Sequence, residues 1–132
     1  MTLIQRLMFE TLGGYAGVAD LVGARVYPDV APQGVARPFL VWQEVTLQQA
    51  NDMSGSVQSG GLDNYLIQVT SWAEGSGERG ATKARELDAQ GRLAMIAATG
   101  FKSLMRDSRS LGYEQDTKLY GHQTDYSVWL KT

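Results

Sequence analysis

Apolar and polar residues alternate most regularly between Leu62 and Ala73, and this stretch predicts the central strand of the fold. Ile67 and Val69 point to one side of such a strand, whereas Gln68 and Trp72 point to the other. Since β-branched and aromatic residues fit a half-buried pleated surface, a strand is favoured over a short buried helix. The smoother apolar side is predicted to face the core.

Three more stretches predict strands, at Phe39 to Val45, Lys102 to Ser108 and Tyr120 to Lys131. The first alternates less clearly, because each of its sides carries an aromatic residue. Its two sides are Phe39, Val41 and Val45, against Leu40, Trp42 and Glu44. A short edge strand near Val26 is also plausible, because the prolines around it disfavour a central strand.

Helical spacing appears at the start and in the middle of the chain. Thr2 and Gln5 form a capping-box pattern before a helix that ends at Gly13, and a short helical turn follows from Val18 to Val22. The main helix is predicted from Glu78 to Thr99. Its inward stripe is Ala81, Ala84, Leu87, Gly91, Ala94, Met95 and Ala98.

Three positions of the main helix carry further predictions. Asp88 and Arg92 are expected to pair on its outer side. Gly91 is a poor helix former, so close packing or a bend is expected there.

This order of elements predicts an α+β fold with the sequence α-β-β-α-β-β. We expect a four-stranded antiparallel sheet, with the N-terminal helix and the long helix packed mainly on one face. The 132 residues suit a single domain over residues 1–132.

The composition narrows the classes of function. The chain has no Cys, which rules out disulfides and cysteine-ligated metals, and its net charge of -2 provides no overall basic field for nucleic acid. No apolar run approaches the ~18 residues of a membrane span, and the first residues do not resemble a secretion signal.

The segment from Thr46 to Gly61 is rich in Gln, Ser and Gly, and it predicts a long flexible loop between two strands. Two interpretations stay open: a solvent-exposed loop, or a loop that becomes ordered only on a partner. In the second case its centre would be an assembly loop. The residues concerned are Asn51, Asp52, Met53, Ser54 and Gly55.

Catalytic residues are hard to find. The single His122 could form a nucleophilic triad only with Asp125 and Ser127, but on a strand it points away from both. One His without Cys or a carboxylate cluster does not predict a metal site. We therefore expect no enzyme activity, no cofactor and no catalytic residues.

The three tryptophans Trp42, Trp72 and Trp129 are all predicted on the sheet face away from the core, beside Gln68 and Glu44. Large aromatic side chains on a polar face are either covered by a loop or helix or used for contact with another chain. The second alternative makes these five residues a candidate subunit interface.

Several motifs together resemble the tail-completion, or tail-terminator, proteins of long-tailed phages and prophages. They are RVYPDVAP at residues 25–32, RPFLVWQEV at 37–45, LIQVTSWA at 66–73 with the helix after it, and YSVWL at 126–130. The resemblance covers nearly the whole chain and depends on order, lengths and loosely matched strand motifs.

The resemblance implies a structural role. Such proteins cap the tail tube as a homo-oligomeric ring, commonly of six subunits, and form the surface to which the head attaches. The implied partners are further copies of the chain, the tail-tube protein and the head-tail connector protein, with DNA crossing the lumen without tight binding and no membrane involved. The implied locations are the host cytoplasm during assembly and the virion tail.

Two alternatives remain beside this interpretation. One is a head-tail connector component of similar size, and the other is a generic α+β binding module with no catalytic role.

Overall fold

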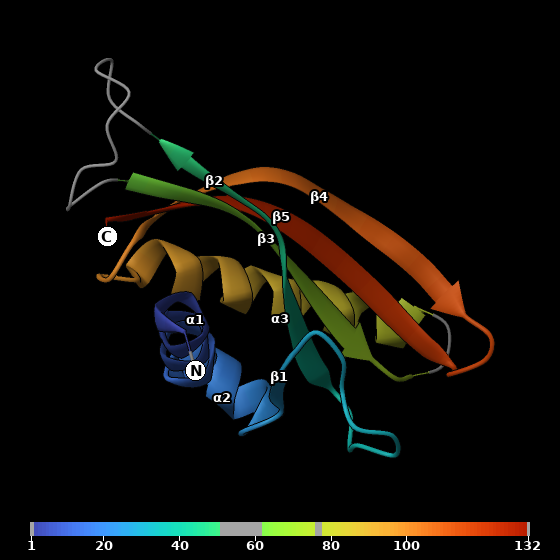
Figure 1. Cartoon of the computed structure of the whole chain (residues 1–132). Coiled ribbons are helices and arrows are strands. Elements are labelled where there is room, and N and C mark those ends of the chain that lie inside the picture. Colours follow the sequence, from blue (N-terminus) through green and yellow to red (C-terminus); the bar gives the residue numbers. More distant parts are fainter. Residues whose placement is uncertain (1, 51–61, 76–77, 132) are drawn as a thin grey trace.

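Helix α1 (Leu3–Gly13) begins at the predicted capping box. In the computed structural model, which describes residues 2–50, 62–75 and 78–131, the Thr2 hydroxyl accepts a hydrogen bond from the Gln5 amide at 3.3 Å. The Thr2 amide in turn donates to the Gln5 side chain at 2.9 Å. A second short helix, α2 (Ala16–Val22), follows directly. Both helices lie on the same side of the sheet as the long helix α3 (Glu78–Ala97) (Figure 1).

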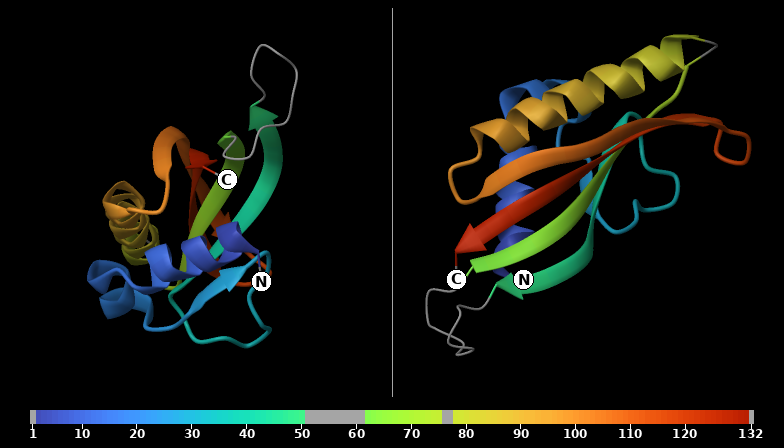
Figure 2. Two further views of the ribbon diagram at one scale, coloured as in Figure 1. Left: turned by 60° about the vertical axis from the view of Figure 1, so that its left-hand side comes forward. Right: turned by 90° about the horizontal axis from the view of Figure 1, so that it is seen from above.

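Five strands form one mixed sheet in the spatial order β1-β2-β3-β5-β4. Their bounds are β1 Val26–Pro28, β2 Phe39–Ala50, β3 Leu62–Ala73, β4 Lys102–Glu114 and β5 Leu119–Lys131. Strands β2, β3, β5 and β4 pair antiparallel, and β1 joins the edge of β2 in parallel. The long strands twist together as one layer (Figure 2), and this layer lies above the helices in Figure 1.

The α+β class and the four antiparallel strands were predicted, but the prediction of a sheet with four strands, all antiparallel, was wrong. The possible edge strand near Val26 is a fifth strand, β1, and its three residues pair with Leu40–Trp42 of β2. The parallel direction follows from the chain path, because residues 29–38 bring the chain back alongside β1 instead of turning in a tight hairpin.

Two strands are longer than predicted. Strand β2 continues through Thr46 to Ala50, opposite Leu66 to Leu62 of β3, so the first five residues of the predicted loop are strand. A bulge between Glu44 and Thr46 shifts the alternation there. Strand β4 reaches Glu114, which reduces the predicted connector from Arg109 to Lys118 to its last four residues.

The core lies between the helices and one face of the sheet. Ile67 and Val69 of β3 are buried in it, as predicted, together with Met8 of α1 and Leu87 of α3. Most of the predicted inward stripe of α3 is buried, whereas Ala81 is exposed. Asp88 was placed on the outer side of the helix, and this was wrong: its side chain is only 2% exposed.

Gly91 is a poor helix former in the interior of helix α3. It is buried, yet an added Cβ would meet no atom within 4 Å, so the predicted close packing is not found at this residue. We expect Gly91→Ala to raise the free energy of unfolding by about 1 kcal/mol, because alanine favours the helix and restricts the unfolded chain. Urea denaturation would measure the change.

A second glycine of α3 gives the matched control. A Cβ at Gly80 would collide with the aromatic ring of Tyr120, so Gly80→Ala should lower stability although alanine is again the better helix former. Equal stabilisation by both substitutions would contradict this account of the two sites.

Candidate functional site

No helix of the described residues lies on one face of the sheet (Figures 1 and 2). The strand registers place on this uncovered face Phe39, Val41, Leu66, Gln68, Thr70, Trp72, Leu104, Gln123, Asp125 and Trp129. These residues mix large apolar groups with polar ones. We call this surface the uncovered face.

A polar network crosses the uncovered face from β3 to β4. Gln68 donates to the Asp125 carboxylate at 3.1 Å, and Arg109 donates to Asp125 at 3.2 Å and to Asp107 at 2.9 Å. Arg109 also donates to Gln123. The pKa of Arg109 is raised, first of all by its hydrogen bond to Asp125. The guanidinium is therefore engaged by acids of its own chain.

The structure separates the three tryptophans that were predicted to share one face. Trp42 pairs with Val69, lies on the helix side and is 4% exposed, so its predicted position was wrong. The alternation within β2 was correct, but the side that meets the helices was not, because Phe39 and Val41 also form an apolar side. Trp42 belongs to the core of a single chain.

Trp72 and Trp129 lie on the predicted face but at opposite ends of it. Trp72 is half-buried over Gly121, where an added Cβ would come within 2.8 Å of the indole. Phe39, Val30 and Leu119 line a hollow beside it. Its own chain thus covers much of Trp72, whereas Trp129 is 39% exposed.

The other candidate residues do not all lie on one face either. Gln68 lies on the uncovered face, as expected. Glu44 pairs with Ile67 and so lies on the helix side, where it is exposed; its predicted face was wrong. The proposed assembly loop, Asn51, Asp52, Met53, Ser54 and Gly55, lies outside the described residues.

A buried polar cluster was not found from the sequence. Asp88 of α3 accepts a hydrogen bond from Thr124 at 2.6 Å, lies 3.0 Å from Arg92 and 3.6 Å from Nε2 of His122. Ser108 of β4 completes the cluster. The signal was available, since Asp88 is four residues after Ala84 and seven before Met95 and so shares the inward side of the helix.

The hydrogen-bond directions in this cluster follow from its donors. Thr124 gives its only hydroxyl proton to Asp88, so Ser108 must donate to Thr124 across their 3.0 Å contact. Arg92 donates to Ser108 at 2.7 Å. The 2.9 Å contact between His122 Nε2 and Ser108 therefore requires an N–H donor on the histidine.

This geometry differs from a nucleophilic triad. A triad needs a base nitrogen that accepts the nucleophile's proton and a carboxylate on the other ring nitrogen. Here Ser108 and Asp88 both approach Nε2, and that nitrogen donates. The separate trio of His122, Asp125 and Ser127 is also split as expected, because Asp125 bonds Gln68 and Ser127 bonds Asn64 on the uncovered face. The buried cluster ties α3 to β4 and β5.

Tyr126 lies beside this cluster with its hydroxyl buried and with no hydrogen-bond partner among the described residues. Burial, followed by the charge of Asp88, raises the pKa of its phenol. The folded state therefore keeps a proton that an unfolded tyrosine releases above about pH 10. Stability is fully present below that pH and falls as the pH rises above it.

We expect Tyr126→Phe to leave the melting temperature near pH 7 unchanged or slightly higher, and to reduce its decline between about pH 10 and 11. Thermal denaturation across this range would measure both effects. Tyr65, whose pKa is also raised by burial, retains part of the decline. Tyr113→Phe, at an exposed ring, controls for removing a phenol elsewhere; a steeper alkaline decline in Tyr126→Phe would contradict the assignment.

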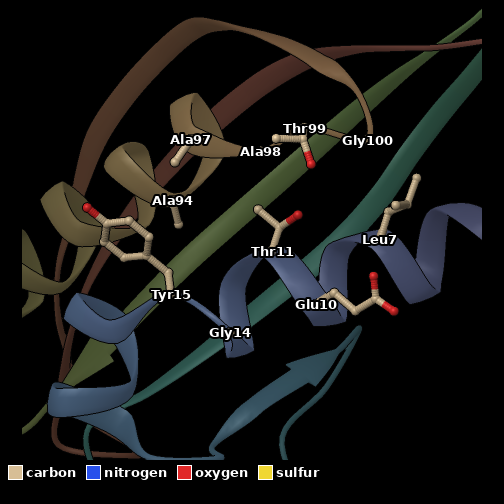
Figure 3. Close-up of a pocket in the computed structure, with 10 residues that line it drawn as sticks. All are labelled: Leu7, Glu10, Thr11, Gly14, Tyr15, Ala94, Ala97, Ala98, Thr99 and Gly100. Carbon is tan, nitrogen blue, oxygen red and sulfur yellow. The ribbon is translucent and has the colours of Figure 1, made fainter.

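A groove between α1 and the end of α3 is the hollow drawn in Figure 3. Its volume is about 260 Å³, and small side chains dominate its walls. Glu10 supplies the single carboxylate among the lining residues, and Leu7, Thr11 and Ala94 lie around it. The other polar side chains of the lining are the hydroxyls of Thr11, Tyr15 and Thr99, and no histidine or cationic group is among the lining residues.

Comparison with known proteins identifies the class of protein, which the geometry alone leaves open. The sequence model of the family described as "Tail completion protein gp17" matches residues 6–131. The chain belongs to this tail completion protein family. No curated protein matches it. Among solved structures, a chain from "Virion of native gene transfer agent (GTA) particle" has a TM-score of 0.75 and 15% identity, with 98% of this chain and 95% of that chain covered.

Membership of this family identifies the broad role of the chain. It is a structural protein of the phage tail, and the prediction that it is not an enzyme is confirmed by this membership. At 15% identity, the neighbour in the gene transfer agent particle supports the fold alone. In the described residues, no helix is long and apolar enough to cross a membrane.

Proposed function

We propose that this tail completion protein acts as a tail terminator. Copies of the chain form a ring, commonly of six subunits, on the end of the tail tube and stop its growth. The ring then presents the surface to which the connector of the filled head attaches. The observation that carries this proposal is the family match over residues 6–131.

Exposed side chains on the surface support the proposal that the chain assembles with other chains. Trp129 and Leu104 are 39% and 65% exposed on the uncovered face, and large exposed aromatic and apolar groups are typical of contact surfaces. Gln68 and Trp72 remain interface candidates on the same face, and Glu44 remains one on the helix side of β2. Trp42 is not one of them, since it is buried within its own core.

DNA is proposed to cross the ring without tight binding. The net charge of -2 and the engagement of Arg109 by Asp107 and Asp125 support this, because tight binding needs cations that are free to replace counterions on phosphates. The proposed partners are further copies, the tail-tube protein and the head-tail connector protein. Assembly would take place in the host cytoplasm.

Electron microscopy of the purified protein mixed with tail tubes tests the proposal directly. We expect a cap on one end of each tube, and tubes that stop growing when tube protein is added. Binding to DNA-filled heads without binding to tubes would favour a connector component instead. Binding to neither would leave the chain as an α+β module with another role in the tail.

A further inference from the structure

The sheet ends in two strand edges that the described residues do not cover. Within the described residues, strand β4 forms one edge and pairs only with β5. At the other edge, β1 pairs with β2 only over Leu40–Trp42, so that no described strand lies on the outer side of β2 from Gln43 to Ala50. An uncovered edge offers a row of backbone donors and acceptors to another strand.

The segments of β2 and β4 that have no bulge lie at the same end of the sheet. One row across the sheet joins Thr46 of β2, Leu66, Ser127 and Leu104 of β4 through successive backbone pairs. Each edge strand has a bulge between this row and the middle of the sheet. The next rows toward the end of the sheet are regular, as far as Ala50 on β2 and Lys102 on β4.

Strand direction makes the two edges suitable for each other. Along β2, β3, β5 and β4 each strand is antiparallel to the one before it, so β2 and β4 run in opposite directions. If a second copy is placed beside the first by rotation about an axis roughly parallel to the strands, its β2 meets β4 antiparallel. Such a head-to-tail contact closes into a ring when the rotation permits.

The side chains at the two edges are complementary. The β4 edge has Leu104 and Met105 exposed, with Lys102 and Arg106 on either side of them. The β2 edge has Val45 and Leu47 exposed, 44% and 51% respectively, with Glu44 beside them. Met105 and Leu47 both lie on the helix side, because they pair with Tyr126 and Tyr65, so they become diagonal neighbours when Leu104 is placed opposite Thr46. In the same register Arg106 comes near Glu44.

The bulges explain why the contact is limited to one short segment. The bulge of β2 separates Glu44 from Thr46, and that of β4 separates Met105 from Asp107. Bulges and charges on an edge strand prevent uncontrolled pairing. The segments left regular are only four or five residues long, which suits a contact that becomes stable when many copies close together.

We propose that residues 102–105 of one copy pair antiparallel with residues 46–50 of the next copy, so that the sheet continues from subunit to subunit around the ring. This inference rests on the proposed function, since it names the contact by which the copies would assemble. The occupant of each edge is a second copy of this chain, because the complementary edge is present on the same molecule at the same level.

Disulfide cross-linking tests the contact, because the chain has no cysteine of its own. Thr46→Cys with Leu104→Cys places two thiols on the uncovered face at the same level. Thr46→Cys with Lys102→Cys tests a register shifted by two residues, as the tilt of strands in a closed barrel requires. All three native positions are exposed, and circular dichroism would confirm folding of each variant.

Each variant is oxidised at high concentration alone and after addition of tail tubes, then run on a non-reducing denaturing gel. We expect one register to give a ladder of dimers, trimers and larger species, because each subunit would contribute one thiol to either side. Thr46→Cys with Ser103→Cys is the matched control. Ser103 points to the helix side, so this pair should give no ladder.

The outcomes separate this inference from the proposed function. Wild-type caps on tubes without a ladder in either register would overturn the edge pairing and leave the terminator role intact. A ladder that ends at dimers, or an equal ladder in the Ser103 control, would also overturn it. A ladder in concentrated protein with bare tubes would support the edge pairing and count against the terminator role. Cross-links from Leu104→Cys to another tail protein alone would assign this edge to that protein instead.

Discussion

Trp42→Ala is expected to lower the free energy of unfolding by about 3 to 5 kcal/mol, the range for deleting a large buried aromatic side chain. The indole is 4% exposed and packs in the core with Leu40, Ile67 and Val69. Its removal leaves a cavity between the sheet and the helices that neighbours fill only in part. Urea denaturation of the purified protein would measure the loss.

Trp129→Ala is the matched control, because it removes the same side chain from the opposite face of the sheet. At 39% exposure, Trp129 should contribute no more than about 1 kcal/mol to the stability of the single chain. Under the proposed function, this variant should stay folded and form fewer caps on tail tubes. Unfolding of Trp129→Ala together with a stable Trp42→Ala would contradict the assignment of the two faces.

Asp88→Ala is expected to destabilise the protein by about 3 kcal/mol, which lowers the melting temperature by roughly 10 °C in a domain of this size. The substitution removes the acceptor for Thr124 and the partner of Arg92, and it leaves polar groups buried without compensation. Asp88→Asn should lose less, because its amide oxygen can still accept from Thr124. Differential scanning calorimetry would rank the two variants.

A double-mutant cycle separates the ion pair from the rest of the cluster. Arg92 is 37% exposed, so part of its interaction with Asp88 is screened by water. If the two side chains interact, the double variant Asp88→Ala with Arg92→Ala should lose less free energy of unfolding than the two single variants lose in sum. Asp20→Ala, at an exposed acid of α2, should change stability by no more than about 0.5 kcal/mol. A neutral Asp88→Ala would show that the cluster is not needed for the fold.

Local patterns determined the elements of this protein. The capping box at Thr2, the alternation from Leu62 to Ala73 and the helical spacing after Glu78 each depend on residues close together in the chain, and all three elements are found. The family resemblance also depended on the order and spacing of such motifs, and the family match supports it. The repeat of a strand shows which side chains share a side, because its period is two.

Tertiary structure decided which of those sides faces the core and which edges stay uncovered. The side of Trp42 depended on its register against Val69, and the burial of Asp88 depended on Thr124 lying opposite its helix. The strand order placed β5 between β3 and β4 and so made β4 an edge. These contacts join residues far apart in the chain. The local pattern places Asp88 on the inward side of its helix, but it specifies neither its partner Thr124 nor the register of Trp42.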